Sequence, residues 1–303
     1  MDMSVVQGSV VVAADGSTAA AAALGWGARF AAREGRPLVV VHACGQPGAM
    51  DDFEDIVASE RGLLSVGRAI AREAVHTARL TDPTLTVDSV VTMGAPADVL
   101  LEAAESAAAV VMGARGRGAV ASALLGSVSS VVIRQARSPV VVVRRPAATY
   151  DAPVVVGVDG TPASTAAVEF AFRRASTEAV PVIVLHATWD LRTRASAILE
   201  TMSYADRVNL SEEEERLVAE TVAGLCERYP DVHVTELYRR GQPVEELVAA
   251  ARNASLVVVG SRGRPMLTSA ILGSVGRGVV ERAACPVAVV RPVSAREGAG
   301  LSA

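Results

Sequence analysis

The sequence predicts an α/β protein made of two tandem domains, each with a parallel sheet covered by helices on both faces. Continuous valine-rich runs such as Val10–Val12 and Val154–Val156 are typical of parallel strands buried on both faces. These runs alternate with longer helical segments, which indicates successive βαβ units. Most of this pattern occurs twice along the chain of 303 residues.

In the first copy, five strand signals alternate with four helical stretches. The strands are expected at about residues 8–14, 37–43, 84–92, 108–113 and 139–143, and the helices near residues 17–35, 55–80, 96–107 and 127–136. Right-handed crossovers then place helices on both faces of the sheet. Ligands of such sheets bind beyond the carboxyl ends of the strands, where the strand order reverses. Asp15 and Gly113 both follow or end strands at that edge.

The second copy repeats this order of elements. Asp159 follows the strand Val154–Val158, and Gly260 follows the run Leu256–Val259. Ser211 followed by Glu212–Glu215 is typical of a capped helix start with acidic residues at the positive end of the helix. We interpret this charge run as a solvated helix end.

The spacing of the repeat defines the domains. Motifs before residue 43 recur 144 positions later and motifs after residue 94 recur 147 positions later, so the second copy has gained three residues between them. Each copy has about 145 residues, a length that buries one core. We predict domains at residues 1–146 and 153–295, joined by a Pro-bounded linker.

A glycine loop is duplicated with constant spacing. Gly113-Ala-Arg-Gly116, nine residues and Gly126-Ser127 recur as Gly260-Ser-Arg-Gly263, nine residues and Gly273-Ser274. Glycines three apart let the main chain approach a ligand, and a Gly-Ser that opens a helix presents N–H groups to an anion. We expect this anion to be a phosphate, the alternative being a constraint of the shared fold.

Charged residues adjoin both loops. Asp15 and Asp159 are either turn residues or carboxylates that accept ribose hydroxyls or share a divalent cation with phosphates, and their position favours the functional reading. Four arginines next to the glycines either pair with phosphate oxygens or serve solubility: Arg115, Arg117, Arg262 and Arg264.

Two other phosphate motifs are excluded. All 29 basic residues are arginine, so the lysine of a P-loop is missing. Residues 116–121 fit the dinucleotide pattern G-x-G-x-x-A, but Pro265 breaks it in the second copy and no acidic residue lies near position 141.

Composition argues against several partners. A net charge of -4 and 3% aromatic residues disfavour a nucleic-acid surface. No run of 18 apolar residues lacks a charge, and the start lacks the basic region of a signal peptide. We therefore expect a cytoplasmic protein that binds neither nucleic acid nor membrane.

The histidines and cysteines are assigned no chemistry. His42 and His186 end the second strand of each copy without a positioned nucleophile or carboxylate, so packing or hydrogen bonding is expected. Cys44, Cys226 and Cys285 have neither a paired framework nor metal-ligand spacing, and we expect free thiols.

Together these residues resemble the universal stress protein family in its ATP-binding branch. The resemblance rests on the strand-end Asp, the loop G-x-x-G, nine residues, G-[ST], and a Pro-started valine-rich last strand, and it covers nearly the whole chain. It implies a doubly wound, Rossmann-like sheet of strand order 3-2-1-4-5 in each half. It also implies that the last strands, Val140–Val143 and Val287–Val290, pair within the chain as a pseudo-two-fold dimer.

The resemblance also implies a ligand, ATP, with Mg²⁺ left open as its companion. Asp15 and Asp159 would contact ribose, and the main chain of Val41 and Leu185 would meet adenine. The other implied contacts are Ala13, Gly113, Gly116, Gly126, Ser127, Val128 and Ser129 in the first copy, and Gly157, Gly260, Gly263, Gly273, Ser274 and Val275 in the second.

Three differences between the two copies fall within or beside these contacts. Gly276 replaces Ser129, whose hydroxyl could touch the terminal phosphate, and Ser261 and Gly157 stand where the first copy has Ala114 and Ala13. We therefore predict unequal affinity of the two sites.

The resulting interpretation is an ATP-binding regulator of stress response or growth, with one site per domain. A slow ATP hydrolase or nucleotidyl transferase, in which Asp15 or Asp159 holds a divalent cation, is one alternative. A nucleotide-independent interaction scaffold is the other. Protein partners are unspecified, and a further homodimer of the tandem chain stays open.

Overall fold

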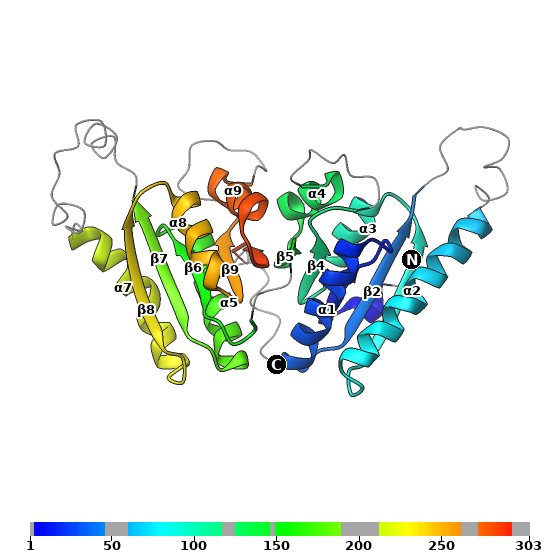
Figure 1. Ribbon diagram of the computed structural model, residues 1–303, viewed down its shortest axis with the longest axis horizontal. Coiled ribbons are helices and arrows are strands. Elements are labelled where there is room, and N and C mark those ends of the chain that lie inside the picture. Colours follow the sequence, from blue (N-terminus) through cyan, green and yellow to red (C-terminus); the bar gives the residue numbers. More distant parts are fainter. Residues whose placement is uncertain are drawn as a thin grey trace. The chain divides into compact units, whose positions relative to one another are not determined.

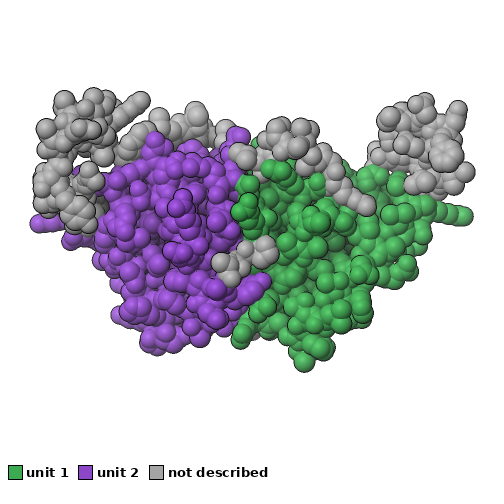
Figure 2. Space-filling model, in the orientation of Figure 1, with its two compact units in different colours: residues 1–146 green, residues 147–303 purple. Residues whose placement is uncertain are grey.

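Valine-rich strands form the centre of both halves of the computed structural model, which describes residues 3–45, 60–116, 125–145, 149–188, 212–261 and 272–292. The chain divides into two units, residues 1–146 and residues 147–303, coloured green and purple in Figure 2.

The described elements of unit 1 alternate between strand and helix after one short 3₁₀ turn. In chain order they are η1 (Ser4–Val6), β1 (Val10–Ala13), α1 (Thr18–Arg33), β2 (Leu38–Cys44), α2 (Glu60–Thr81), β3 (Val87–Met93), α3 (Pro96–Ala103), β4 (Ala109–Gly113), α4 (Ser127–Gln135) and β5 (Val140–Val143).

The described elements of unit 2 follow the same order. They are β6 (Val154–Val158), α5 (Pro162–Glu178), β7 (Val182–Thr188), α7 (Glu212–Arg228), β8 (Val234–Arg240), α8 (Pro243–Ala250), η3 (Ala251–Asn253), β9 (Leu256–Gly260), α9 (Ser274–Arg282) and β10 (Val287–Val290).

The sheets have the predicted strand order. In unit 1 the strands lie in the order β3-β2-β1-β4-β5, and in unit 2 the order is β8-β7-β6-β9-β10. All of these neighbours within a unit pair in parallel. Numbered within each unit, both orders are 3-2-1-4-5, so the predicted α/β, doubly wound fold is confirmed.

Helices cover the sheet of unit 1 on both faces. Helix α1 packs against β1, β4 and α2, whereas α3 packs against β2 and α4 (Figure 1). The strands between these layers are fully enclosed, since Val10–Val12 and Leu38–Val40 have no exposed surface. Burial on both faces explains why these strands read as continuous apolar runs rather than as alternating ones.

Two element boundaries were predicted wrongly. The third strand begins at Val87 rather than near residue 84, because Asp82 Oδ1 accepts hydrogen bonds from Thr84 N and Thr84 Oγ1 (2.9 and 2.7 Å) and closes a turn. The third helix ends at Ala103 rather than near residue 107, because the chain after it turns towards the sheet and Ser106 O accepts a hydrogen bond from Gly8 N at 2.9 Å. The expected cap Ser211 and residues 55–59 lie outside the described residues.

The same turn leads from the first strand to the first helix in both units. Gly16 and Gly160 adopt positive φ angles of 76° and 79°, a conformation that glycine tolerates without strain. The next residue then caps the helix, because Ser17 Oγ accepts from Ala20 N and Thr161 Oγ1 accepts from Ser164 N. The first helix therefore starts at an equivalent place in each unit.

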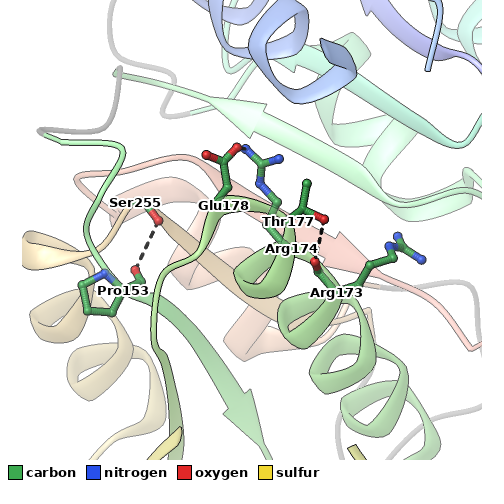
Figure 3. A network of polar contacts seen from close by, with 6 residues as sticks. All are labelled: Pro153, Arg173, Arg174, Thr177, Glu178 and Ser255. Carbon is green, nitrogen blue, oxygen red and sulfur yellow. Dashed lines mark hydrogen bonds and ion pairs between the residues drawn. The ribbon is translucent and has the colours of Figure 1, made fainter. Parts of the chain in front are cut away.

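Unit 2 contains an ion pair on α5 that is almost completely buried (Figure 3). Arg174 and Glu178 lie one turn apart, and their side chains are only 6% and 8% exposed. Nearby, Thr177 Oγ1 donates to Arg173 O at 2.9 Å and Ser255 Oγ donates to Pro153 O at 3.3 Å. Removing either partner of such a pair would leave an uncompensated charge in a poorly hydrated place.

Within the described residues, no helix is both long and apolar enough to cross a membrane.

The packing of α1 on β1 depends on a glycine. A Cβ on Gly27 would lie 2.5 Å from Val12 Cγ2, whereas a Cβ on Gly25 of the same helix would meet no atom within 4 Å. We expect Gly27→Ala to lower the free energy of unfolding by about 1–3 kcal/mol through overpacking. Gly25→Ala should raise it by about 0.5–1 kcal/mol, because alanine is the better helix former.

Urea unfolding followed by circular dichroism measures both changes. If the two variants shifted the midpoint equally and in the same direction, the close contact at Gly27 would be disproved.

Candidate functional site

A cavity of about 600 Å³ opens at the carboxyl ends of β1, β2 and β4 in unit 1. It lies where the strand order reverses, the usual ligand position in doubly wound sheets. It contains ten residues singled out from the sequence: Ala13, Asp15, Val41, Gly113, Arg115, Gly116, Gly126, Ser127, Val128 and Ser129. Its volume is in the range of small-molecule and cofactor sites.

The two carboxylate oxygens of Asp15 face different partners. Oδ1 accepts a hydrogen bond from Ser17 N at 2.9 Å, which fixes the turn into α1. Oδ2 faces the glycine loop, since a Cβ built on Gly116 would lie only 2.5 Å from it. Asp15 is therefore both a turn residue and a carboxylate at the cavity, so the two readings of this residue are compatible.

The two glycines of the loop are needed for different reasons. A Cβ on Gly113 would lie 2.8 Å from the carbonyl carbon of Ala19, so this position lets β4 end directly against the first turn of α1. Gly260 stands in the same relation to Ala163 in unit 2. Gly116, by contrast, makes room for the carboxylate of Asp15. Packing explains the first glycine of the motif, and the approach to Asp15 explains the second.

Helix α4 begins at the cavity without a side-chain cap. Its N-cap is Gly126, and no side chain accepts a hydrogen bond from its first turn in the described structure. Ser127 and Val128, both in that first turn, line the cavity. The uncapped N–H groups and the helix dipole give this end of the cavity a positive potential.

Ser129 anchors the loop to the sheet. It is 3% exposed, and its Oγ donates to Gly113 O at 3.0 Å, with Ala114 O 3.4 Å away. Ser129 lines the cavity, and its hydroxyl donates its hydrogen bond to the carbonyls at the end of β4. Its visible role is to hold the loop in place.

The sequence reasoning missed the rest of the wall: Ala14, Ala20, Ala43, Pro96, Leu100, Met112 and Leu125. Two signals could have found part of it. Ala43 lies two residues after Val41, on the same face of β2. Pro96 belongs to the repeated motif Gly94-Ala-Pro96 that opens α3.

The structure places the unit 2 candidates at matching positions. Gly157 and Leu185 are register partners on β6 and β7, and Asp159 Oδ1 accepts hydrogen bonds from Thr161 N and Thr161 Oγ1 at 3.0 and 2.7 Å. Gly260 ends β9, Gly273 is the N-cap of α9, and Ser274 and Val275 begin that helix. Arg117, Arg262, Gly263 and Arg264 lie outside the described residues.

Leucines occupy space in unit 2 at two of the positions where the copies differ. The side chain of Leu272 is buried, and its Cδ1 would lie 3.3 Å from a Cβ on Gly276, where unit 1 has the Ser129 anchor. Leu247 Cδ1 would lie 3.2 Å from a Cβ on Gly157, the counterpart of Ala13. Unit 1 has leucines at the same two places, Leu125 and Leu100, so the difference at the loop is the missing serine anchor and not a more apolar wall.

Both strand-end histidines form the expected hydrogen bonds. His42 Nδ1 lies 2.6 Å from Ala14 O, and His186 Nδ1 lies 2.7 Å from Val158 O. Each ring thus joins the end of the second strand to the end of the first.

The described residues contain no cluster of three or more His, Cys, Asp or Glu side chains that could hold a metal ion. Burial raises the pKa of the Cys44 thiol, and it raises the pKa of Cys285 to about 12. Both thiols therefore stay protonated and unreactive at neutral pH.

Comparison with known proteins identifies the family. Residues 8–144 and 152–291 each match the model of the universal stress protein family. This chain belongs to the universal stress protein family. The match covers both units, which confirms the family resemblance and the tandem arrangement.

Family members from mycobacteria align over almost the full chain. Universal stress protein Rv2005c of Mycobacterium tuberculosis is 38% identical over 297 residues, which are 94% of this chain and 97% of that protein. Universal stress protein Rv1996 of the same organism is 36% identical over 304 residues, covering 93% of this chain and 94% of that protein.

A solved member of the family has the same fold. The crystal structure of a universal stress protein from Archaeoglobus fulgidus matches with a TM-score of 0.69 at 20% identity, and it covers 95% of this chain and 97% of the other.

Two of the three cysteines are buried and one is exposed, so a thiol reagent should label them selectively. We expect iodoacetamide to modify Cys226, which is exposed, and to leave Cys44 and Cys285 unmodified in the folded protein. Intact-mass spectrometry should show one adduct per native chain and three per urea-unfolded chain. Rapid native modification of Cys285 would contradict its burial beside Pro286.

Proposed function

We propose that the unit 1 cavity binds an adenine nucleotide, ATP in the first place, and that the protein is a nucleotide-dependent regulator in stress or growth. One observation carries the proposal. The glycine loop, Asp15 and the uncapped start of α4, which the sequence alone marks as nucleotide contacts, line a single cavity of suitable volume. Membership of the universal stress protein family supports it.

The walls of the cavity suit the parts of a nucleoside triphosphate. Val41, Leu100 and Met112 offer an apolar surface for the base. The carboxylate of Asp15 suits ribose hydroxyls, since these donate hydrogen bonds and carry no charge. A phosphate beside the same carboxylate would be repelled unless a cation lay between them.

The phosphates would lie against a part of the cavity wall that attracts negative charge. The N–H groups at Ser127 and Val128 and the guanidinium of Arg115 attract anions, and all three residues line the cavity. Arg117, which lies outside the described residues, adds a second arginine next to Gly116 in the sequence motif. We propose that the triphosphate lies along Gly113–Gly116 and the start of α4.

We extend the proposal to unit 2 with a weaker site. Asp159, Gly260, Gly273 and Ser274 repeat the positions of the unit 1 contacts. Gly276 stands where unit 1 has Ser129, so the hydroxyl that anchors the loop at the phosphate end is missing. A loop without its serine anchor has more conformational freedom to lose when it binds a ligand.

A binding role suits the described residues better than fast catalysis. Asp15 is the one carboxylate in the described cavity wall, and neither a cysteine nor a histidine lines it. A Mg²⁺ ion that accompanies ATP would be held mainly by the phosphates. Any hydrolysis should therefore be slow, and a cytoplasmic location follows from the proposed use of ATP.

Nucleotide released by denaturing the freshly purified protein tests the proposal. We expect ATP as the main species in chromatography. Gly116→Ala should weaken ATP binding about tenfold or more, because its Cβ collides with Asp15 Oδ2 and relief of such overpacking costs about 1–3 kcal/mol. Gly25→Ala, an open helical position, is the matched control and should bind normally.

A second variant separates binding from folding. Asp15→Asn keeps an oxygen for Ser17 N and loses the charge, so it should fold normally and bind ATP more weakly. Unchanged affinity in both variants would favour the interaction scaffold. Predominantly ADP, with steady turnover that both Asp15→Ala and Asp159→Ala reduce, would favour the hydrolase.

Calorimetry tests the difference between the units. We expect a titration with Mg-ATP to resolve two classes of site, the tighter in unit 1. Ser129→Gly should weaken that class about fivefold to tenfold, because a buried hydrogen bond of about 1 kcal/mol is lost. Two equal sites in the wild type would refute the predicted difference.

A further inference from the structure

Helix α2 carries a row of arginines along one face, here called the arginine stripe: Arg61, Arg68, Arg72 and Arg79. Their spacings of seven, four and seven residues place them within about 20° of one line along the helix, at 3.6 residues per turn. All four are exposed. The row spans roughly 27 Å at 1.5 Å per residue.

Most of the stripe has no anionic partner in the described part of the chain. Among the residues the structure describes, Arg61, Arg68 and Arg72 form no ion pair, while Arg79 donates to Val87 O at 3.0 Å. Four exposed arginines on helices of unit 2 are paired with glutamates instead: Arg216 with Glu220, Arg228 with Glu169, Arg277 with Glu281 and Arg282 with Glu245.

The fold itself does not require the stripe. Helix α7 occupies in unit 2 the place that α2 occupies in unit 1, between the second and third strands of its sheet. At the repeat offset of 147, the counterparts of Arg68, Arg72 and Arg79 are Glu215, Ala219 and Cys226. A helix can therefore cover this sheet without a single arginine in these three places.

Apolar side chains are exposed on the same helix. Of the large hydrophobic side chains exposed in the described residues, Val66 (48%) and Leu80 (71%) both lie on α2, and only Val5 lies elsewhere. They are 14 residues apart and so share one side of the helix. At 100° per residue this side lies roughly 100° to 140° around the helix axis from the arginine stripe, so the apolar pair is a separate exposed feature and not part of the proposed docking surface.

Helix α7 presents the complementary charge. It has six glutamates and two arginines, and both arginines are already paired with glutamates. Glu212, Glu215 and Glu227 are exposed and form no ion pair within the described residues. These three residues are here called the acidic face of α7. The corresponding helices of the two units thus carry opposite net charge.

We propose that the arginine stripe of one chain docks on the acidic face of α7 of a second copy of this chain. Since the two surfaces differ, the contact either forms twice across a two-fold axis or repeats head to tail into a ring or a filament. Each exposed ion pair contributes little, so the association depends on several pairs together and weakens with salt. The inference is independent of the nucleotide site.

Sedimentation velocity of the full chain tests this assembly. We expect species heavier than the 31.2 kDa chain at about 0.1 M salt and single chains at about 1 M, where the Debye length falls to about 3 Å. The double variant Arg68→Glu/Arg72→Glu and the double variant Glu215→Arg/Glu227→Arg should each remain single chains. An equimolar mixture of the two should associate, because each supplies the surface that the other lacks.

The double variant Arg145→Glu/Arg252→Glu is the control. It changes the net charge by the same amount as the α2 variant, at exposed sites outside α2, and should assemble like the wild type. The proposal is overturned if the wild-type chain stays single at low salt, or if the α2 variant assembles normally. It is also overturned if anionic vesicles or nucleic acid bind the single wild-type chain and not the α2 variant.

Discussion

The contact between the end of the fourth strand and the first turn of the first helix is the constraint on which the site depends. With no side chain at Gly113, β4 ends directly against Ala19, and the loop that follows must start beside the turn containing Asp15. Unit 2 has the same contact between Gly260 and Ala163. A larger residue would separate strand from helix and open the edge of the sheet where the cavity forms.

The two units share this constraint and differ in what is built on it. In unit 1 a buried serine hydroxyl ties the start of α4 back to the strand, and in unit 2 Gly276 at the same position has no hydroxyl. A hydrogen bond positions a loop directionally, so its loss leaves the unit 2 loop with less angular restraint. The scaffold therefore allows one copy to change at its ligand edge while its sheet and helices stay the same.

Much of the fold and part of the site could be predicted from the sequence. Buried parallel strands appear as valine runs, and the constant spacing of the glycine loop marked residues that do line one cavity. The strand start at Val87 was missed because a side-chain turn at Asp82 interrupts the apolar pattern. The cavity walls at Leu100 and Met112 were missed because their positions depend on how α3 and β4 pack. Unpaired arginines on α2 likewise need coordinates, since sequence shows charge and not partners.

The divided role of the strand-end aspartate limits what motif searches can say about duplicated chains. One oxygen of Asp15 serves folding and the other faces the ligand edge, and Asp159 forms the same folding contact. A copy that lost its ligand would still be selected to keep this residue, because the helix after it starts there. The aspartate motif after the first strand therefore indicates common descent and a shared turn. Whether a copy binds a ligand has to be judged from the loop after its fourth strand.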